Sequence, residues 1–263
     1  MKKAARYRPI RRKAGPFAVT VWFCYALTAT MLALCLSWGV YAQFDYGYPV
    51  WYRVLHIGQH IDEYAPQNRY HRHDLERLSA QQQQALFHRI VVAVHHQGDG
   101  LGEITYPDRY GTPVPLLRAP EIQHLRDVSH FIDHGRWLAL ILALLWLPLA
   151  RAVRNGPDVR RCQRLAVVAV PLLALLAWLV IAGPEAVFYR FHIWLFPAGH
   201  EWFFYWQDSL MSTLMKAPDL FGAIALVLAA CTVIVTPLLY WGGLGLVARL
   251  FAARRRQANG RKA

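Results

Sequence analysis

Histidine is the residue type whose number and placement in this sequence point most directly to chemistry. Its imidazole gains and loses a proton near neutral pH, so it serves as a general acid or base. The sequence contains 12 histidines, and all lie in the two segments that follow the first and third long apolar runs or at the outer end of the second run. They are His56, His60, His71, His73, His88, His95, His96, His124, His130, His134, His192 and His200. We expect most of them to be ordinary surface residues, and two stand out by their context.

His124 is the first of these two, and it lies in the polar run Pro120–Val128. Proline is favoured at the first position of a helix, so a helix is predicted to begin near Pro120. Glu121 and Asp127 lie three residues on either side of His124, which is one helical turn. A carboxylate there can fix the tautomer of the imidazole and raise its basicity. The alternative interpretation is a polar turn that faces lipid headgroups.

His192 is the second, in an apolar stretch from Glu185 to Pro197 that is followed by the aromatic run Trp202–Trp206. Such aromatic density is typical of a membrane interface and also suits a slot for acyl chains. A partly desolvated imidazole favours its neutral, proton-accepting form. The alternative interpretation is a structural histidine packed among aromatic rings.

The spacing of the histidines does not predict a metal centre. No His-Glu-x-x-His motif occurs, and adjacent pairs such as His95-His96 rarely bind one ion together. We therefore predict no metal and no cofactor. No cysteine falls in residues 43–128 or 184–218, the segments predicted to lie outside the cell, so no disulfide framework is predicted either. The four cysteines are Cys24, Cys35, Cys162 and Cys231.

Four apolar runs must position the histidines. A helix needs about 20 apolar residues to cross a bilayer, and we predict membrane helices over residues 17–42, 129–150, 165–183 and 219–248. The first run follows basic residues as a signal peptide does, but it is about twice as long as the usual apolar core of one. The predicted fold class is an all-α integral membrane protein with four transmembrane helices, both termini inside the cell and a small mixed extracytoplasmic cap.

The basic residues orient these helices. The net charge is +13, and 18 of the 29 Lys and Arg residues lie in residues 2–13, in the loop 151–164 and in the tail 249–263. The positive-inside rule places all three segments in the cytoplasm. Because this explains the excess of positive charge, we predict no nucleic-acid partner.

The remaining segments, residues 43–128 and 184–218, are predicted to lie on the outer side. Residues 43–128 mix charges of both signs and predict a small folded cap, with a helical stretch over residues 71–94 and solvated glutamines at Gln81–Gln84. Residues 98–115 are rich in Gly and Pro and predict loops with a hairpin. Residues 184–218 form an outer aromatic loop, and the whole chain 1–263 is one membrane domain.

Several of these residues resemble the bacterial lipoprotein intramolecular transacylase family. The motifs that carry the likeness are Glu121-x-x-His124-x-x-Asp127-Val128, Phe191-His192 with its aromatic tail, and Trp202 followed by Asp208-Ser209-Leu210-Met211 and Pro218. The likeness extends from about Pro49 to the end of the fourth apolar run. It implies an enzyme of the bacterial cytoplasmic (inner) membrane with an extracytoplasmic active site. Such an enzyme moves an acyl chain from the glycerol of a diacylglyceryl-cysteine lipoprotein to the α-amino group of the same cysteine.

The resemblance maps the family's histidine pair onto His124 and His192. We expect His124 to be the general base, oriented by Asp127 or Glu121, and His192 to protonate the leaving oxygen or stabilise the oxyanion, with the two roles exchangeable. A two-step route through an acylated histidine stays open. The partner is a diacylated lipoprotein or another membrane lipid. The residues expected to contact it are Tyr189, Arg190, Phe191, Trp194, Trp202 and Asp208.

Two other classes of function remain as alternatives. One is a non-enzymatic membrane scaffold or assembly factor with an aromatic docking surface outside the cell. The other is a transporter or channel, which usually carries a charged residue within the bilayer. The predicted helices 17–42, 165–183 and 219–248 are almost free of charge, so a transporter is disfavoured.

Overall fold

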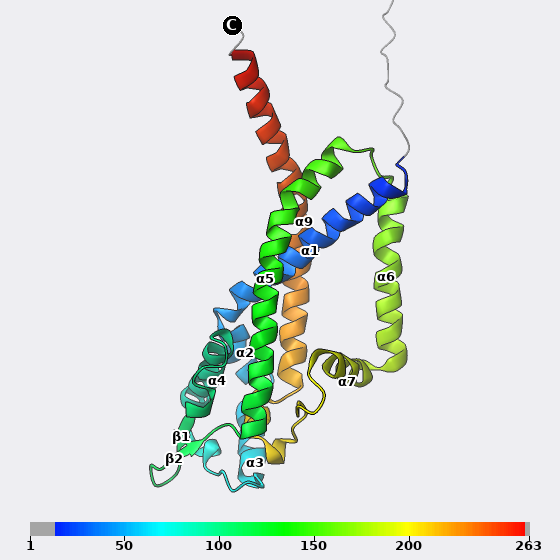
Figure 1. The fold of residues 1–263 in the computed structure, drawn as a ribbon. Coiled ribbons are helices and arrows are strands. Elements are labelled where there is room, and N and C mark those ends of the chain that lie inside the picture. Colours follow the sequence, from blue (N-terminus) through cyan, green and yellow to red (C-terminus); the bar gives the residue numbers. More distant parts are fainter. Residues whose placement is uncertain (1–13, 261–263) are drawn as a thin grey trace, which may run out of the picture. The chain divides into compact units, whose positions relative to one another are not determined.

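The computed structural model describes residues 14–260, so the basic residues 2–13 and the last three residues of the C-terminal tail lie outside the described part. Within residues 14–260, four helices are long and apolar enough to cross a membrane (Figure 1). They are α1 (Pro16–Ala42), α5 (Ala119–Asn155), α6 (Arg161–Ala182) and α9 (Asp219–Gly260). Four such helices fit a multi-pass membrane protein, as the apolar runs predicted.

The helices extend beyond the predicted spans at their polar ends. The helix predicted to begin near Pro120 is continuous with the second span, and together they form α5. The predicted loop 151–164 shrinks to residues 156–160, because α5 continues to Asn155 and α6 begins at Arg161. The predicted spans are shorter because an apolar run shows only the part of a helix that suits lipid. The backbone hydrogen bonds of the helix continue into the polar residues on either side.

The chain divides into two compact units. Within the described residues, unit 1 comprises 14–33, 140–184 and 234–260, and unit 2 comprises 34–139 and 185–233. In unit 1, Tyr25, Ala150 and Val247 are buried together. The Tyr25 hydroxyl donates to the backbone carbonyl of Tyr240, and the indole N–H of Trp22 donates to the Tyr240 hydroxyl at 2.8 Å. These contacts join α1 to α9 inside unit 1.

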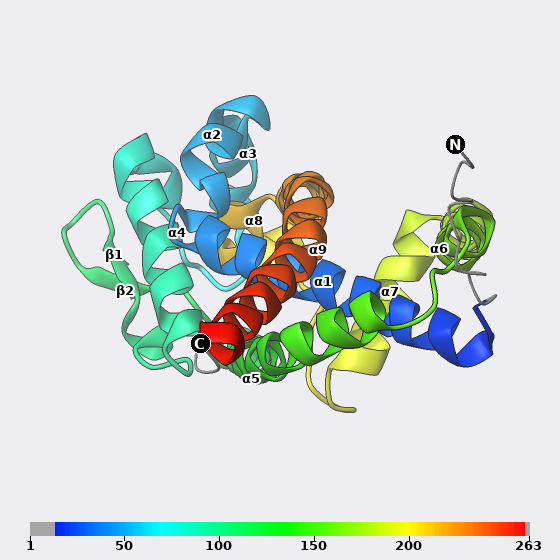
Figure 2. The same cartoon turned by 90° about the horizontal axis from the view of Figure 1, so that it is seen from above.

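Unit 2 contains most of the buried core. Its further helices are α2 (Tyr48–Val54), α3 (Ile57–Tyr64), α4 (Ala80–His95), α7 (Pro184–Leu195) and α8 (Leu210–Met215), with short 3-10 turns at residues 45–47, 65–67, 75–77, 101–103 and 206–208. Helices α2, α3, α4 and α8 gather around one core (Figure 2). Tyr48 is fully buried, stacks on Phe87 at 3.9 Å and donates to the carbonyl of Leu214 at 2.6 Å. One side chain thus ties α2 to α4 and α8.

The predicted helix over residues 71–94 is shorter in the structure. It begins after Ser79, whose side chain and that of Gln82 cap α4 reciprocally. Residues 71–78 form turns instead, and His71 and Asp74 have positive φ values of 57° and 76°. The prediction of solvated glutamines is wrong for Gln83, which is buried, donates to the carbonyl of Leu75 at 3.0 Å and accepts from the Tyr52 hydroxyl.

The predicted hairpin is confirmed. Strands β1 (Thr105–Pro107) and β2 (Pro113–Pro115) pair antiparallel, with Tyr106 opposite Val114. The turn between them is held by Asp74, whose carboxylate accepts from the Arg109 backbone N–H and guanidinium at 2.9–3.2 Å. This ion pair lowers the pKa of Asp74 below its usual range.

The predicted outer loop 184–218 is helical at both ends. Helix α7 occupies its start, and α8 is a short buried helix near its end, capped by the Ser209 hydroxyl, which accepts from the backbone N–H of Ser212 at 2.9 Å. Residues 196–209, which include the 3-10 turn at 206–208, and residues 216–218 lie outside these helices.

Candidate active site

His124 and His192 meet through one aromatic ring. Helix α5 carries His124, helix α7 carries His192, and Phe196 follows the end of α7. The ring centroid of Phe196 lies 4.8 Å from that of His124 and 5.4 Å from that of His192, nearly parallel to the latter at 25°. The structure therefore brings together the two histidines that the sequence singled out. All three residues belong to unit 2.

The tautomer of His192 follows from its hydrogen bond. Nδ1 of His192 lies 2.8 Å from the backbone carbonyl oxygen of Phe188, one turn earlier in α7. A carbonyl only accepts, so Nδ1 carries the hydrogen, and Nε2 of the neutral ring keeps its lone pair. Burial lowers the pKa of His192 below its ordinary value. The neutral ring with an accepting Nε2 is therefore the prevailing form at neutral pH.

Among the described residues, no hydrogen bond fixes the tautomer of His124. It packs against Phe196 and, at 6.0 Å between ring centroids, against Phe204. Its Nδ1 is buried and has no hydrogen-bond partner. Buried polar atoms are nearly always paired, so an unpaired one calls for an explanation.

Neither expected carboxylate hydrogen-bonds His124. Glu121 is completely buried and turns back to the start of its own helix, where it accepts from the backbone N–H of Arg118 at 2.5 Å. This is half of a capping box, in which an N3 carboxylate binds the N-cap amide. Glu121 is thus placed to hold the start of α5, one turn before His124.

Asp127 binds a different histidine. Its Oδ2 lies 2.7 Å from Nδ1 of His200, and its Oδ1 accepts from the side-chain amide of Gln123 at 3.2 Å. The carboxylate is mostly buried, with 10% of its side chain exposed, whereas the His200 side chain is 36% exposed. Asp127 is also close enough to His124 for an electrostatic interaction.

The residues expected to contact substrate separate into two groups. Trp202 lies against His192 at 4.8 Å between centroids, and Tyr189 packs on Trp202 at 5.2 Å. Phe191 presents its edge to His192 at 5.5 Å but is half exposed. Arg190 and Trp194 are exposed on α7, and Asp208 pairs with Arg69 at 3.3 Å instead of facing the histidines.

The sequence did not single out several residues of this cluster. Phe196 and Phe204 line the histidines, and the guanidinium of Arg118 lies 4.2 Å from the ring centre of Tyr70 and 5.8 Å from that of Phe204. The one signal available was the density of aromatic residues after His192, which does not say which ring faces inwards. Within residues 14–260, no cluster of three or more His, Cys, Asp or Glu side chains could hold a metal ion.

Four membrane-length helices, together with two histidines set among aromatic rings, assign this chain to the class of helical multi-pass membrane proteins. The sequence profile of lipoprotein intramolecular transacylase Lit matches residues 69–217, more than half of the chain, including both histidines. The chain therefore belongs to the lipoprotein intramolecular transacylase family. No curated protein and no solved structure matches it.

Proposed function

We propose that this protein is a membrane-embedded acyltransferase that moves an acyl chain within a diacylglyceryl-cysteine lipoprotein, from the glycerol oxygen to the α-amino group of the cysteine. Membership of a transacylase family supports the reaction class. The observation that carries the proposal is the cluster of His124, Phe196 and His192, in which Nε2 of His192 is left free to accept a proton.

In the proposed mechanism His192 is the general base. Its Nε2 takes a proton from the amine as nitrogen attacks the ester carbonyl and the C–N bond forms. The same proton then passes to the glyceryl oxygen as the C–O bond breaks, so the products are an amide and a free hydroxyl. The sequence assigned the base to His124 and left the roles exchangeable. The hydrogen bond of His192 Nδ1 to Phe188 favours the exchange.

His124 then stabilises the oxyanion of the tetrahedral intermediate. A neutral imidazole always has one N–H to donate, and no hydrogen bond occupies the buried Nδ1 of this ring. A fixed donor in a site of low polarity stabilises developing charge far more than the same donor in water. Because donor ester and acceptor amine belong to one molecule, holding them together removes much of the entropic barrier.

Acyl chains are proposed to reach the histidines along the aromatic residues of unit 2. Trp202 and Phe204 flank the two rings, and the exposed side chains of α7, Ile193 and Trp194, suit contact with lipid. We place this site on the outer side of the bacterial cytoplasmic membrane, because the basic segments predict cytoplasmic positions for the opposite ends of the helices.

Mass spectrometry of the N-terminal lipopeptide of a lipoprotein tests the function. Cells that produce the wild-type protein, His124→Ala, His192→Ala or no protein are compared at equal expression. An N-acyl, S-monoacylglyceryl cysteine that forms only with the wild-type protein is expected. Identical lipopeptides in all four strains would refute the transacylase. A loss of thermal stability in both variants, without any change in lipopeptide, would favour the membrane scaffold instead.

A further inference from the structure

The charge balance of the proposed reaction leaves one proton over. The α-amino group of a peptide has a pKa of about 7.7–8.0, so it is mostly an ammonium ion at pH 7. An ammonium ion and an ester give an amide, an alcohol and one free proton. The base His192 returns the proton it takes to the leaving oxygen, so it does not remove this surplus. A substrate bound as the ammonium ion must therefore lose a proton to some other group before it can attack.

A histidine–carboxylate pair, formed by His200 and Asp127, lies one helical turn from His124. Asp127 follows His124 by one turn of α5, and Nδ1 of His200 lies 2.7 Å from its Oδ2. Gln123 holds the other carboxylate oxygen. Because Nδ1 faces a carboxylate, the hydrogen stays on Nδ1 and Nε2 of the neutral ring can accept a proton. The carboxylate then stabilises the imidazolium that forms.

The difference in exposure between Asp127 and His200 sets the direction in which a proton would move. Asp127 is mostly buried, at 10% side-chain exposure, whereas His200 is 36% exposed and can pass a proton to water. The titratable groups nearest His200 are Asp127, which contacts its ring, and Glu201, which follows it in the chain; His124 lies one turn before Asp127 on α5. Of these, Asp127 is the one that binds its ring.

We propose that His200, anchored by Asp127, takes the surplus proton from the substrate ammonium ion and releases it to water. This inference rests on the proposed function. It assigns Asp127 to His200, where the sequence assigned it to His124. On this view His192 moves a proton from nitrogen to oxygen within the reaction, and His200 exports the proton that the reaction does not keep.

The test compares His200→Gln with the wild-type protein from pH 7 to pH 9. Glutamine keeps an N–H donor for Asp127 but cannot take up a proton. At pH 9 the substrate arrives as the free amine, and the variant is expected to match the wild type. At pH 7 only a minor fraction arrives neutral, so the variant is expected to be about five- to tenfold slower relative to its own rate at pH 9. Added imidazole should restore the rate of His200→Ala at pH 7.

Four outcomes separate the possibilities. Equal rates of His200→Gln and wild type at every pH would overturn the proton-export role. An equal loss at every pH, or no rescue by imidazole, would overturn it as well, because it would show a structural role only. Failure of the wild-type protein to form product at any pH would refute the proposed function instead.

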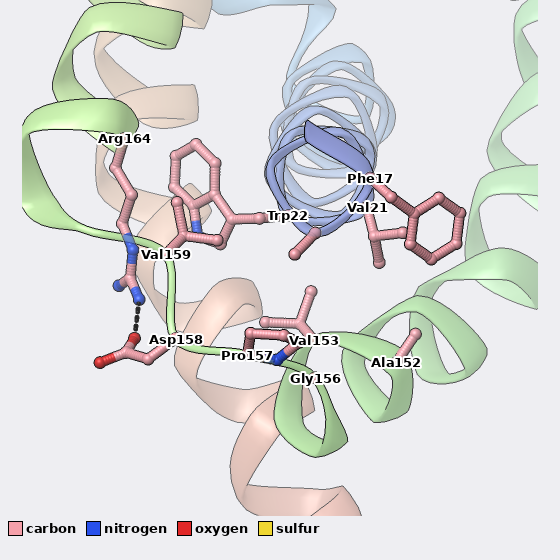
Figure 3. Close-up of a pocket in the computed structure, with 11 residues that line it drawn as sticks. Phe17, Val21, Trp22, Ala152, Val153, Gly156, Pro157, Asp158, Val159 and Arg164 are labelled. Atoms are coloured by element: carbon pink, nitrogen blue, oxygen red, sulfur yellow. Dashed lines mark hydrogen bonds and ion pairs between the residues drawn. The ribbon is translucent and has the colours of Figure 1, made fainter. Parts of the chain in front are cut away.

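A separate feature of unit 1 points to a lipid site. A hollow of about 140 Å³ lies between the start of α1, the end of α5 and the turn that leads into α6 (Figure 3). Phe17, Val21 and Trp22 of α1 and Val153 of α5 give it an apolar lining. The one ion pair at its edge joins Arg164 to Asp158 at 2.7 Å, among the residues that line it (Figure 3).

One basic side chain, Arg164, lines this hollow together with its ion-pair partner Asp158, and the chain segment that contributes both is basic. The segment 151–164 holds five arginines and one aspartate. The guanidinium of Arg164 lies 5.7 Å from the ring centre of Trp22, and its Nε is buried with no hydrogen-bond partner. Basic pockets between membrane helices typically bind anionic headgroups, because a phosphate meets arginine donors while its chains stay in the apolar phase.

We propose that this hollow binds a phospholipid with an anionic headgroup, its phosphate on Arg164 and the start of an acyl chain along Phe17 and Val21. The apolar side chains suit the acyl chain of such a lipid, and the guanidinium of Arg164 suits its phosphate. This site is independent of the acyl-transfer site in unit 2.

Native mass spectrometry of the detergent-purified protein tests the lipid site with phosphatidylglycerol and phosphatidylcholine. The wild type and the control Arg249→Gln, outside the hollow, are expected to retain phosphatidylglycerol preferentially. Arg164→Gln and Ala18→Trp, which fills the hollow, are expected to lose that preference several-fold. Equal retention of both lipids by the wild type, or unchanged retention by Arg164→Gln, would overturn the proposal. Competition by inorganic phosphate at the same concentration as the lipid would show an anion site rather than a lipid site.

Discussion

Phe196 lies against both His124 and His192. Local sequence context identified the two histidines but not this phenylalanine. The two histidines were identifiable because each lies in an unusual local run, with carboxylates around one and aromatic rings around the other. Phe196 is one of many aromatic residues in its region, and only the fold selects it. The same holds for His200, which binds Asp127 from 73 residues away.

In the proposed mechanism, the pH dependence of catalysis follows from the protonation state of His192. Burial lowers the pKa of this histidine, so the base stays neutral as the pH falls through the ordinary histidine range near 6.5. Protonation of His192 is therefore expected to lower the rate only below about pH 6.5, and a dependence at higher pH comes from the substrate amine. Initial rates with a synthetic diacylated lipopeptide, divided by the fraction of neutral amine, measure this. A decline of this corrected rate that begins above pH 7 would contradict the assignment of His192 as the base.

His60 is expected to make stability depend on pH. It is buried beside Tyr64 and Trp206, its Nε2 has no hydrogen-bond partner, and burial together with the charge of Lys216 lowers its pKa to about 4. In the unfolded chain its pKa is about 6.5, so below that value the unfolded state binds more protons. Stability should therefore fall as the pH drops from about 6.5 to about 4.

Thermal unfolding of the purified protein at pH 7 and pH 5 checks this, with His60→Phe as the comparison. Phenylalanine fills the site between the two aromatic rings and does not titrate, so the difference between the two pH values should shrink. An unchanged difference in the variant would assign the pH dependence to another group.

At the level of elements, α4 illustrates how a helix start is determined. The Ser79 side chain accepts from the Gln82 amide at 3.3 Å, and the Gln82 side chain accepts from the Ser79 amide at 2.9 Å. Loss of an N-cap side chain costs about 1 kcal/mol. Ser79→Ala is expected to lower the melting temperature by a few degrees, and Ser79→Asp, which keeps an acceptor, should change it little. Equal effects of the two substitutions would show that the cap contributes nothing.

The sequence predicted the long apolar helices and the hairpin, because each depends on local composition. It predicted less well where tertiary contacts override local preference. Residues 71–78 have apolar side chains at helical spacing, yet they form turns around Asp74, which binds Arg109 of the hairpin. Gln83 lies in a polar run and is nevertheless buried, because it meets the carbonyl of Leu75 and the hydroxyl of Tyr52. Such partners cannot be read from one segment.

Glu121 shows the same limit in the site itself. Its spacing from His124 predicted an orienting carboxylate, and the spacing is correct for a helix. The start of α5 nevertheless falls at Ala119, so Glu121 occupies the position from which a carboxylate binds the first free amide, that of Arg118. The same spacing allows Glu121 either to orient His124 or to cap the start of α5. The position of the helix boundary decides between the two roles, and a helix boundary is hard to predict from sequence.

At the scale of the whole molecule, the two units have different surfaces. Unit 2 contains the large buried core together with the histidine cluster, whereas α6 of unit 1 carries exposed apolar residues such as Leu172, Val180 and Ile181. Exposed apolar side chains along a helix of this length suit lipid rather than water. The distribution of basic residues in turn predicts which end of each helix is cytoplasmic.

Labelling with a membrane-impermeant maleimide tests that orientation. Cys162 is exposed at the start of α6, and Tyr110, at the hairpin tip, is 85% exposed. The positive-inside rule places Cys162 in the cytoplasm and the hairpin outside. In intact cells whose outer surface is accessible, Tyr110→Cys is expected to be labelled and Cys162 only after permeabilisation, with Cys162→Ser as the control that removes the second signal. Labelling of Cys162 before permeabilisation, with Tyr110→Cys protected, would place the histidines on the cytoplasmic side. They would then face away from the compartment in which mature lipoproteins carry their free α-amino group, and the proposed reaction would need a different substrate.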